Sequence, residues 1–182
     1  KGNYYFTDAI SDKSVSYIQK NKSSGKPFFL YVAYTAPHWP IHAPQDLIDS
    51  YKSTYTQGWE ALRKQRFDRQ KKLNLNAAIQ GLPPTDPSLV SFEKEADKNI
   101  WIEKMATYAA MVDKMDQGIG QIIQELKTNG TFDNTVIFFL SDNGACHEIL
   151  DDRSSKDLGQ EKFNASLTAK IGAPGSYTTY GK

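Results

Sequence analysis

The distribution of apolar and polar positions along the chain predicts two short strands with a long helix between them. Residues 28–34 and 135–140 are apolar at almost every position and rich in aromatic and β-branched side chains. Such runs are typical of strands that are buried on both faces, as in a parallel sheet covered by helices. Residues 91–127 instead repeat apolar side chains at helical spacing, and Asn129 and Gly130 end that pattern.

Other segments favour helices. Ile10, Ser14 and Ile18 follow a period near 3.6 residues, and Thr7 or Asp8 can cap the helix that they predict. Shorter helical patterns cover, in chain order, residues 46–51, 58–73 and 158–167. The order helix, strand, long helix, strand predicts an α/β fold in which helices cover a mostly parallel sheet.

Composition argues against nucleic-acid binding, membrane insertion and cysteine-based sites. Lysine plus arginine number 22 and aspartate plus glutamate 21, so the net charge of +1 predicts no nucleic-acid partner and no anionic membrane partner. The longest apolar run, residues 28–34, is far shorter than the roughly 20 residues that cross a bilayer, which excludes a spanning helix. The single cysteine, Cys146, excludes an internal disulfide and a multi-cysteine metal site.

Polar side chains follow both predicted strands, where ligands of α/β folds bind. The first strand leads into His38, which could serve as a general acid or as a hydrogen-bond donor to an oxyanion. The alternative is a loop histidine that packs beside Trp39. The second leads into Asp142 and Asn143, whose oxygens suit Ca²⁺ or Mg²⁺. The alternative is an ordinary turn in which Gly144 adopts a positive φ.

Other candidates favour structural roles. His42 is interpreted as a solvated loop residue, and Asp113 and Asp116 as a surface pair or as partners of neighbouring loops. The methionines are predicted to lie in the core. A basic cluster is interpreted as a solvated helix face, with a polysulfated glycan as the alternative partner; it comprises Arg63, Lys64, Arg66, Arg69, Lys71 and Lys72.

Four stretches in a fixed order carry a resemblance to a known family: residues 5–10, 28–44, 108–120 and 134–144. Together they resemble the sulfatases, in particular the arylsulfatases of the alkaline-phosphatase-like superfamily. The bacterial branch is the most similar because of two motifs, Ala36-Pro37-His38-Trp39-Pro40 and Ser141-Asp142-Asn143-Gly144-Ala145.

The resemblance implies a role for each candidate. Asp142 and Asn143 match the pair that binds Ca²⁺ in the family, and His38 matches the histidine that contacts the sulfate ester and can protonate the leaving alcohol. A cation and a proton donor are suited to the charge that develops on sulfuryl and leaving oxygens. The expected substrate is an aryl or carbohydrate sulfate ester, and the expected location of the protein is periplasmic or secreted.

Several family residues have no match in this chain. The family nucleophile is a formylglycine made in a Cys/Ser-x-Pro-x-Arg motif, which neither Cys146 nor any serine here has. Asp151 and Asp152 follow no apolar strand, so they do not match the family's aspartate pair, and Lys182 is not assigned as the downstream lysine. Residues 1–182 are therefore expected to be the central part of a sulfatase catalytic domain, without the nucleophile segment and the C-terminal part, and inactive alone.

Two alternatives remain open. The parent protein could hydrolyse phosphate or phosphonate diesters, since related enzymes use the same fold and metal. The chain could also be a catalytically silent binding fragment, and exposed sheet edges would then favour self-association.

Overall fold

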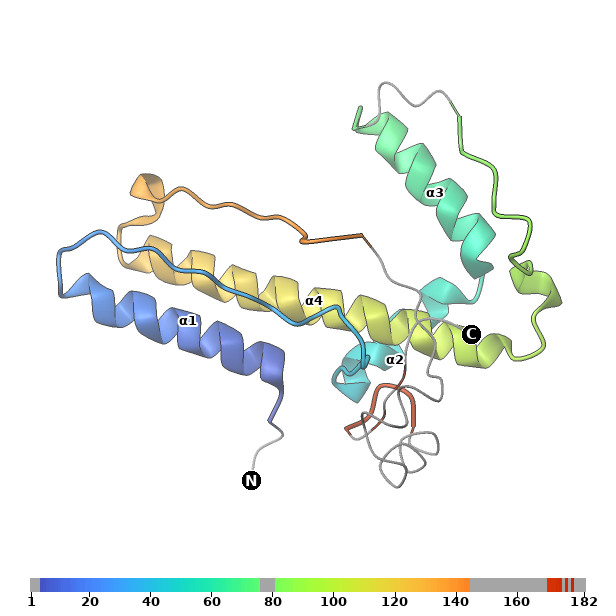
Figure 1. Ribbon diagram of the computed structural model, residues 1–182, viewed down its shortest axis with the longest axis horizontal. Coiled ribbons are helices and arrows are strands. Elements are labelled where there is room, and N and C mark those ends of the chain that lie inside the picture. Colours follow the sequence, from blue (N-terminus) through green and yellow to red (C-terminus); the bar gives the residue numbers. More distant parts are fainter. Residues whose placement is uncertain (1–3, 76–80, 145–169, 175, 177, 179–182) are drawn as a thin grey trace.

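The computed structural model describes residues 4–75, 81–144, 170–174, 176 and 178 (Figure 1). Regular structure in this part of the chain is helical. The elements are α1 (Phe6–Lys22), α2 (Gln45–Tyr55), α3 (Gly58–Lys72), η1 (Phe92–Lys94), α4 (Lys98–Thr128) and η2 (Phe132–Asn134), where η marks a 3₁₀ turn.

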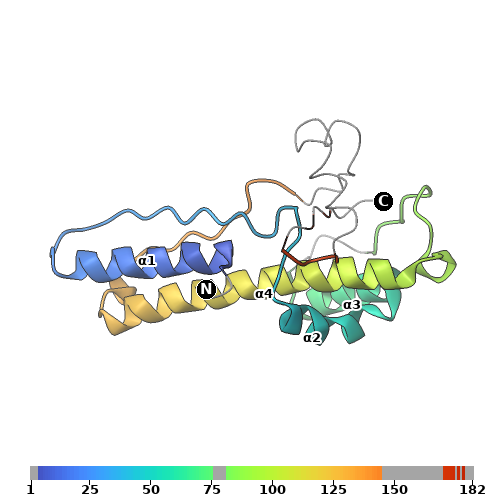
Figure 2. The same ribbon diagram turned by 90° about the horizontal axis from the view of Figure 1, so that it is seen from below.

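Helices α1 and α4 lie side by side and run in the same direction. Lys114 Nζ lies 3.1 Å from Asp8 Oδ1, and Gln19 Nε2 donates to Glu125 Oε2 at 2.9 Å. The earlier residue of α1 thus contacts the earlier residue of α4, and the later contacts the later, so the two helices are parallel. After each helix the chain returns as an extended segment, drawn light blue and orange in Figure 1. Figure 2 shows both segments on the same side of the helix pair. Both units therefore consist of a helix followed by an extended segment and have the same orientation, and α2, α3 and η1 lie between them in the sequence.

The two extended segments, residues 28–34 and 135–140, differ from the prediction in pairing and burial. Within the described residues they form no strand ladder. Phe29 is 93% exposed and Phe138 83% exposed, so the predicted burial on both faces is wrong in this structure. The physical reason is that the helices cover one side of residues 28–34 and leave residues 136–140 exposed, and no described segment pairs with either backbone. The predicted sheet therefore stays a prediction.

The predicted helices are present, with shifted ends. α1 begins at Phe6 and follows Tyr5, so Thr7 and Asp8 lie inside its first turn and the predicted caps are wrong. α4 begins at Lys98 because the preceding chain is fastened elsewhere: the amide of Phe92 donates to Glu60 of α3 at 3.1 Å. Residues 158–167 lie outside the described part.

The core is formed where α2 crosses the N-terminal half of α4. Ala106 and Ala110 are fully buried and allow α2 to approach closely, and Ile48 fills the contact. Met111 is buried and Met115 packs against this cluster, as predicted, whereas Met105 is 39% exposed. Loop residues between the first extended segment and α2 complete the cluster: Ala36, Ile41 and Ala43. The loop that carries His38 is therefore built into the core.

No helix among the described residues combines the length and the apolar character that a bilayer-crossing segment needs. At 31 residues α4 exceeds the roughly 20 residues required, but its surface is too polar.

Candidate functional site

His38 stands on a loop that is anchored on both sides. Ala36 is 8% exposed and Ile41 is fully buried, whereas the His38 side chain is exposed. The amide of His38 donates to Thr35 O at 2.9 Å and closes a turn. A fixed backbone thus presents an accessible imidazole at the end of the first extended segment.

The hydrogen bond of the His38 ring determines which nitrogen can react. Nδ1 lies 2.5 Å from the carbonyl oxygen of Trp39, and the two rings are 5.1 Å apart. A carbonyl oxygen only accepts, so Nδ1 carries a hydrogen and Nε2 is the nitrogen that can exchange a proton with a ligand. Packing beside Trp39 and a role in proton transfer are therefore compatible.

Asp142 and Asn143 follow the second extended segment in an exposed bend. Ser141 Oγ donates to the carbonyl oxygen of Asn143 at 2.6 Å and fixes this bend. Both extended segments run toward the same end of the molecule in the two views of Figures 1 and 2. Among the described residues there is no group of three or more His, Cys, Asp or Glu that could hold a metal. The calcium role of the pair stays a prediction.

His42 differs from its interpretation as a solvated residue. It is half-buried, and its Nε2 lies 2.5 Å from the carbonyl oxygen of Ser176, 134 positions away in the sequence. Its own carbonyl accepts a hydrogen bond from Tyr5 Oη at 2.8 Å. Sequence reasoning missed this contact because no local pattern links residues so far apart.

The six residues of the basic cluster all lie on α3 and are distributed around it. Lys64 pairs with Asp68 at 2.7 Å, and Arg63 donates to the carbonyl oxygen of Pro83 at 2.6 Å. At 100° per residue the six cations cover the whole circumference rather than one face. This arrangement favours the solvated interpretation over a shaped anion site.

Asp113 connects two helices. It accepts a hydrogen bond from Tyr51 Oη of α2 at 2.8 Å, as well as one from Gln117 at 2.9 Å. The bond to Asp113 is the largest cause that raises the pKa of Tyr51 above its ordinary value, and burial adds to it. Asp113 thus has a structural hydrogen-bonding role, but its partners lie on helices, so the prediction of loop partners is wrong.

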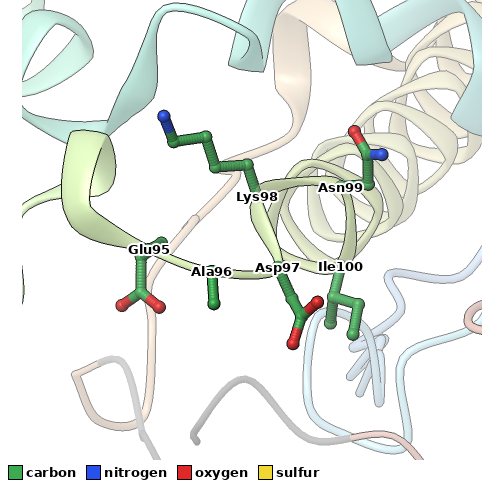
Figure 3. Close-up of a pocket in the computed structure, with 6 residues that line it drawn as sticks. All are labelled: Glu95, Ala96, Asp97, Lys98, Asn99 and Ile100. Carbon is green, nitrogen blue, oxygen red and sulfur yellow. The ribbon is translucent and has the colours of Figure 1, made fainter.

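A surface pocket lies away from these residues, where the chain enters α4. Its lining comes from one short stretch, Glu95–Ile100. Figure 3 shows the carboxylates of Glu95 and Asp97 on one side of the backbone and the Lys98 side chain on the other. Its polar groups do not converge, and none of the predicted site residues lines it.

Several residues considered in the sequence lie outside the described part, namely Cys146, Asp151, Asp152 and Lys182. The structure therefore places His38 after the first extended segment and Asp142 and Asn143 after the second, and the two segments run in the same direction (Figure 1).

Comparison with known proteins agrees with the resemblance. The model of the family described as "Sulfatase" matches residues 1–174. The chain belongs to the sulfatase family. It is 36% identical to an uncharacterized sulfatase of Schizosaccharomyces pombe over 155 residues, covering 82% of this chain and 27% of that protein. It is 32% identical to an arylsulfatase of Klebsiella aerogenes over 180 residues, covering 98% of this chain and 38% of the enzyme.

A more distant sulfatase relative is the human N-sulphoglucosamine sulphohydrolase, 30% identical over 120 residues that make up 65% of this chain and 21% of that protein. Fungal, bacterial and mammalian proteins all match, so the comparisons do not single out the bacterial branch. The chain spans about a quarter to two fifths of the length of the first two relatives.

Proposed function

We propose that the protein containing this chain hydrolyses sulfate esters of aryl or carbohydrate alcohols. The sulfatase match over residues 1–174 carries the proposal. Its support in the structure is the exposed imidazole of His38 on a loop anchored in the core. The relatives named arylsulfatase and N-sulphoglucosamine sulphohydrolase indicate the two substrate classes.

His38 would act on the leaving alcohol. Because Nδ1 donates to Trp39 O, the imidazolium form presents its second N–H at Nε2. A proton delivered from Nε2 to the ester oxygen neutralises the charge that develops there as the sulfur–oxygen bond breaks. This help matters most for poor leaving groups such as sugar alcohols, and least for a nitrophenol.

The carboxylate of Asp142 and the amide oxygen of Asn143 would hold a calcium ion. Both are exposed oxygen donors of the kind that Ca²⁺ prefers. A Ca²⁺ shell takes six to eight oxygens, so the pair fits as part of a shell that other residues complete. When bound, the cation would stabilise negative charge on the sulfuryl oxygens.

The two extended segments would be neighbours in one parallel sheet. Their common direction and their position over one side of α1 and α4 support this proposal (Figures 1 and 2). So does their exposed apolar surface, which a folded protein would cover. In this arrangement residues 1–182 are the central part of the catalytic domain, and the chain alone would release no sulfate.

The test is sulfate release by the full-length protein, with para-nitrophenyl sulfate and a glucosamine sulfate as substrates and bis(para-nitrophenyl) phosphate as the competing diester. His38→Asn keeps an amide N–H at the position of Nδ1 and removes Nε2. We expect this variant to lose about 10²- to 10⁴-fold in kcat on the sugar sulfate and much less on the nitrophenyl ester. Faster turnover of the diester than of both sulfates would overturn the proposal.

The same protein would act outside the cytoplasm, in the periplasm or after secretion. The resemblance to exported sulfatases supports this location. Fractionation of cells expressing the full-length protein tests it, with a cytoplasmic enzyme as the marker.

A further inference from the structure

Two segments that are far apart in the sequence meet at the loop that carries His38. The amide of Ile41 donates to Thr178 O at 3.0 Å, and the amide of Ala43 donates to Gly172 O at 3.3 Å. Between these two bonds, His42 pairs with Gly172 as an isolated parallel bridge. The backbone on both sides of His42 is thus joined to the C-terminal segment.

The side chain of His42 adds a third connection. Its Nε2 lies 2.5 Å from Ser176 O, and since a carbonyl only accepts, Nε2 carries a hydrogen and donates. Ser176 is 2% exposed, and its buried Oγ has no hydrogen-bond partner among the described residues. Burying an unpaired hydroxyl is unfavourable. Other contacts must therefore hold Ser176 in place, and the His42 ring is one of them.

The partner segment is itself fixed in the core. Gly172 has a φ of +81°, and a Cβ at this position would lie 2.7 Å from Ile48 Cδ1 and 2.9 Å from Thr107 Oγ1. Ile48 and Thr107 are fully buried. On the other side, Tyr5 Oη donates to the carbonyl oxygen of His42 at 2.8 Å. The ring therefore connects the loop to a segment that packs against the core at Gly172.

We propose that His42 is a positioning residue for His38, which acts by fastening the loop to Ser176 through the Nε2–H donor. The inference rests on the proposed function, in which His38 protonates the leaving alcohol. His38 is only four positions before His42, so release of the ring loosens the same loop. Displacement of a reacting group by about 1 Å can cost 10²-fold in rate.

A matched pair of substitutions in the full-length protein separates the hydrogen bond from the bulk of the side chain. In His42→Gln the side-chain amide nitrogen is as many bonds from Cα as Nε2 of histidine and can still donate to Ser176 O. In His42→Asn the amide nitrogen occupies the position of Nδ1 and falls short. We expect Gln to preserve kcat on a sugar sulfate, and Asn to lower kcat by about tenfold to hundredfold with little change in KM.

A second readout does not depend on the reaction. The amide of His38 donates to Thr35 O and the amide of Ile41 to Thr178 O, so their hydrogen exchange reports on the loop. We expect both amides to exchange faster in His42→Asn and at the original rate in His42→Gln.

The outcomes are distinguishable. Equal behaviour of the Asn and Gln variants, in exchange and in kcat, would overturn the role of His42. Faster exchange in His42→Asn without a change in kcat would show a structural contact that does not position His38, and would overturn it as well. If the original protein releases no sulfate from any ester, the proposed function fails. The exchange of the His38 amide still decides whether His42 holds the loop.

Discussion

At the scale of single residues, two glycines of α4 show how closely the helices pack. A Cβ on Gly118 would lie 2.0 Å from Ser11 Oγ and 3.0 Å from Tyr34 Oη, whereas a Cβ on Gly120 meets no atom within 4 Å. Ser11 Oγ and Tyr34 Oη are 2.8 Å apart and hydrogen-bonded. Gly118 therefore allows α1, α4 and the first extended segment to meet at one point.

This contact predicts opposite effects for two alanine substitutions in one helix. Gly118→Ala forces Ser11 and Tyr34 apart and should lower the free energy of unfolding by about 1–3 kcal/mol. Gly120→Ala has open space and should raise that free energy by up to about 1 kcal/mol, because alanine favours helices more than glycine does. Urea denaturation of both variants measures the difference. An equal shift for the two would contradict the packing described.

At the scale of elements, the junction of α2 and α4 contains an ionisable pair. Tyr51 donates to Asp113, and its pKa is raised above the unfolded value of about 10, first by that hydrogen bond and then by burial. A raised pKa in the folded state stabilises the fold while the phenol is protonated. The contribution is complete below pH 10 and is lost as the pH rises through the folded pKa.

Tyr51→Phe should therefore weaken the protein at neutral pH and lose its effect in alkali. At pH 8 the substitution removes a hydrogen bond worth about 0.5–1.5 kcal/mol. The difference in urea midpoint between the original protein and the variant should shrink as the pH rises above 10. The pKa values of Tyr5, Tyr34 and Tyr55 are also raised by burial, but these residues are common to both proteins and cancel in the difference.

Tyr17→Phe is the control, because Tyr17 is 56% exposed on α1. It should leave the midpoint unchanged at every pH. A Tyr51→Phe effect that grows with pH would show that the sign of this linkage is wrong.

The same elements show what a sequence can predict. The central parts of α1 and α4 could be predicted from the spacing of apolar and small residues, as with Ile10, Ser14 and Ile18 of α1, because helix periodicity is a local property. The predicted start of the long helix at residue 91 is wrong because a distant contact holds the chain before α4: the ring of Phe92 lies 5.0 Å from that of Trp59, a residue of α3. Tertiary contacts of this kind leave no periodic signal.

The candidate site also has a part that the sequence could predict and a part that it could not. His38, Asp142 and Asn143 could be named from the residues that follow apolar runs together with the family resemblance. The bond of His42 to Ser176 could not be predicted, because the two residues are brought together only by the folding of the intervening chain.

At the scale of the whole molecule, the two extended segments carry several of the most exposed apolar side chains among the described residues. Along residues 135–140, Val136, Phe138 and Leu140 are each at least 76% exposed. Along residues 28–34, Phe29 is 93% exposed. Apolar segments with unpaired backbone associate with other strands in water. The sheet proposed above would cover both segments in the full-length protein.

Charged substitutions at Phe29 and Phe138 should therefore improve the solution behaviour of the isolated chain and destabilise the full-length protein. In the isolated 182-residue chain, Phe29→Lys with Phe138→Lys should reduce self-association, measured by light scattering, because charge on exposed strands opposes pairing. In the full-length protein the same pair of substitutions should destabilise the fold by more than about 2 kcal/mol, because each lysine would be buried in the sheet and lose its contact with water. Leu89→Lys, at a position that is 66% exposed in a loop, is the control and should change neither property. A full-length protein that keeps its stability with both lysines would mean that these segments face water in the complete molecule, and the proposed sheet would have to be abandoned.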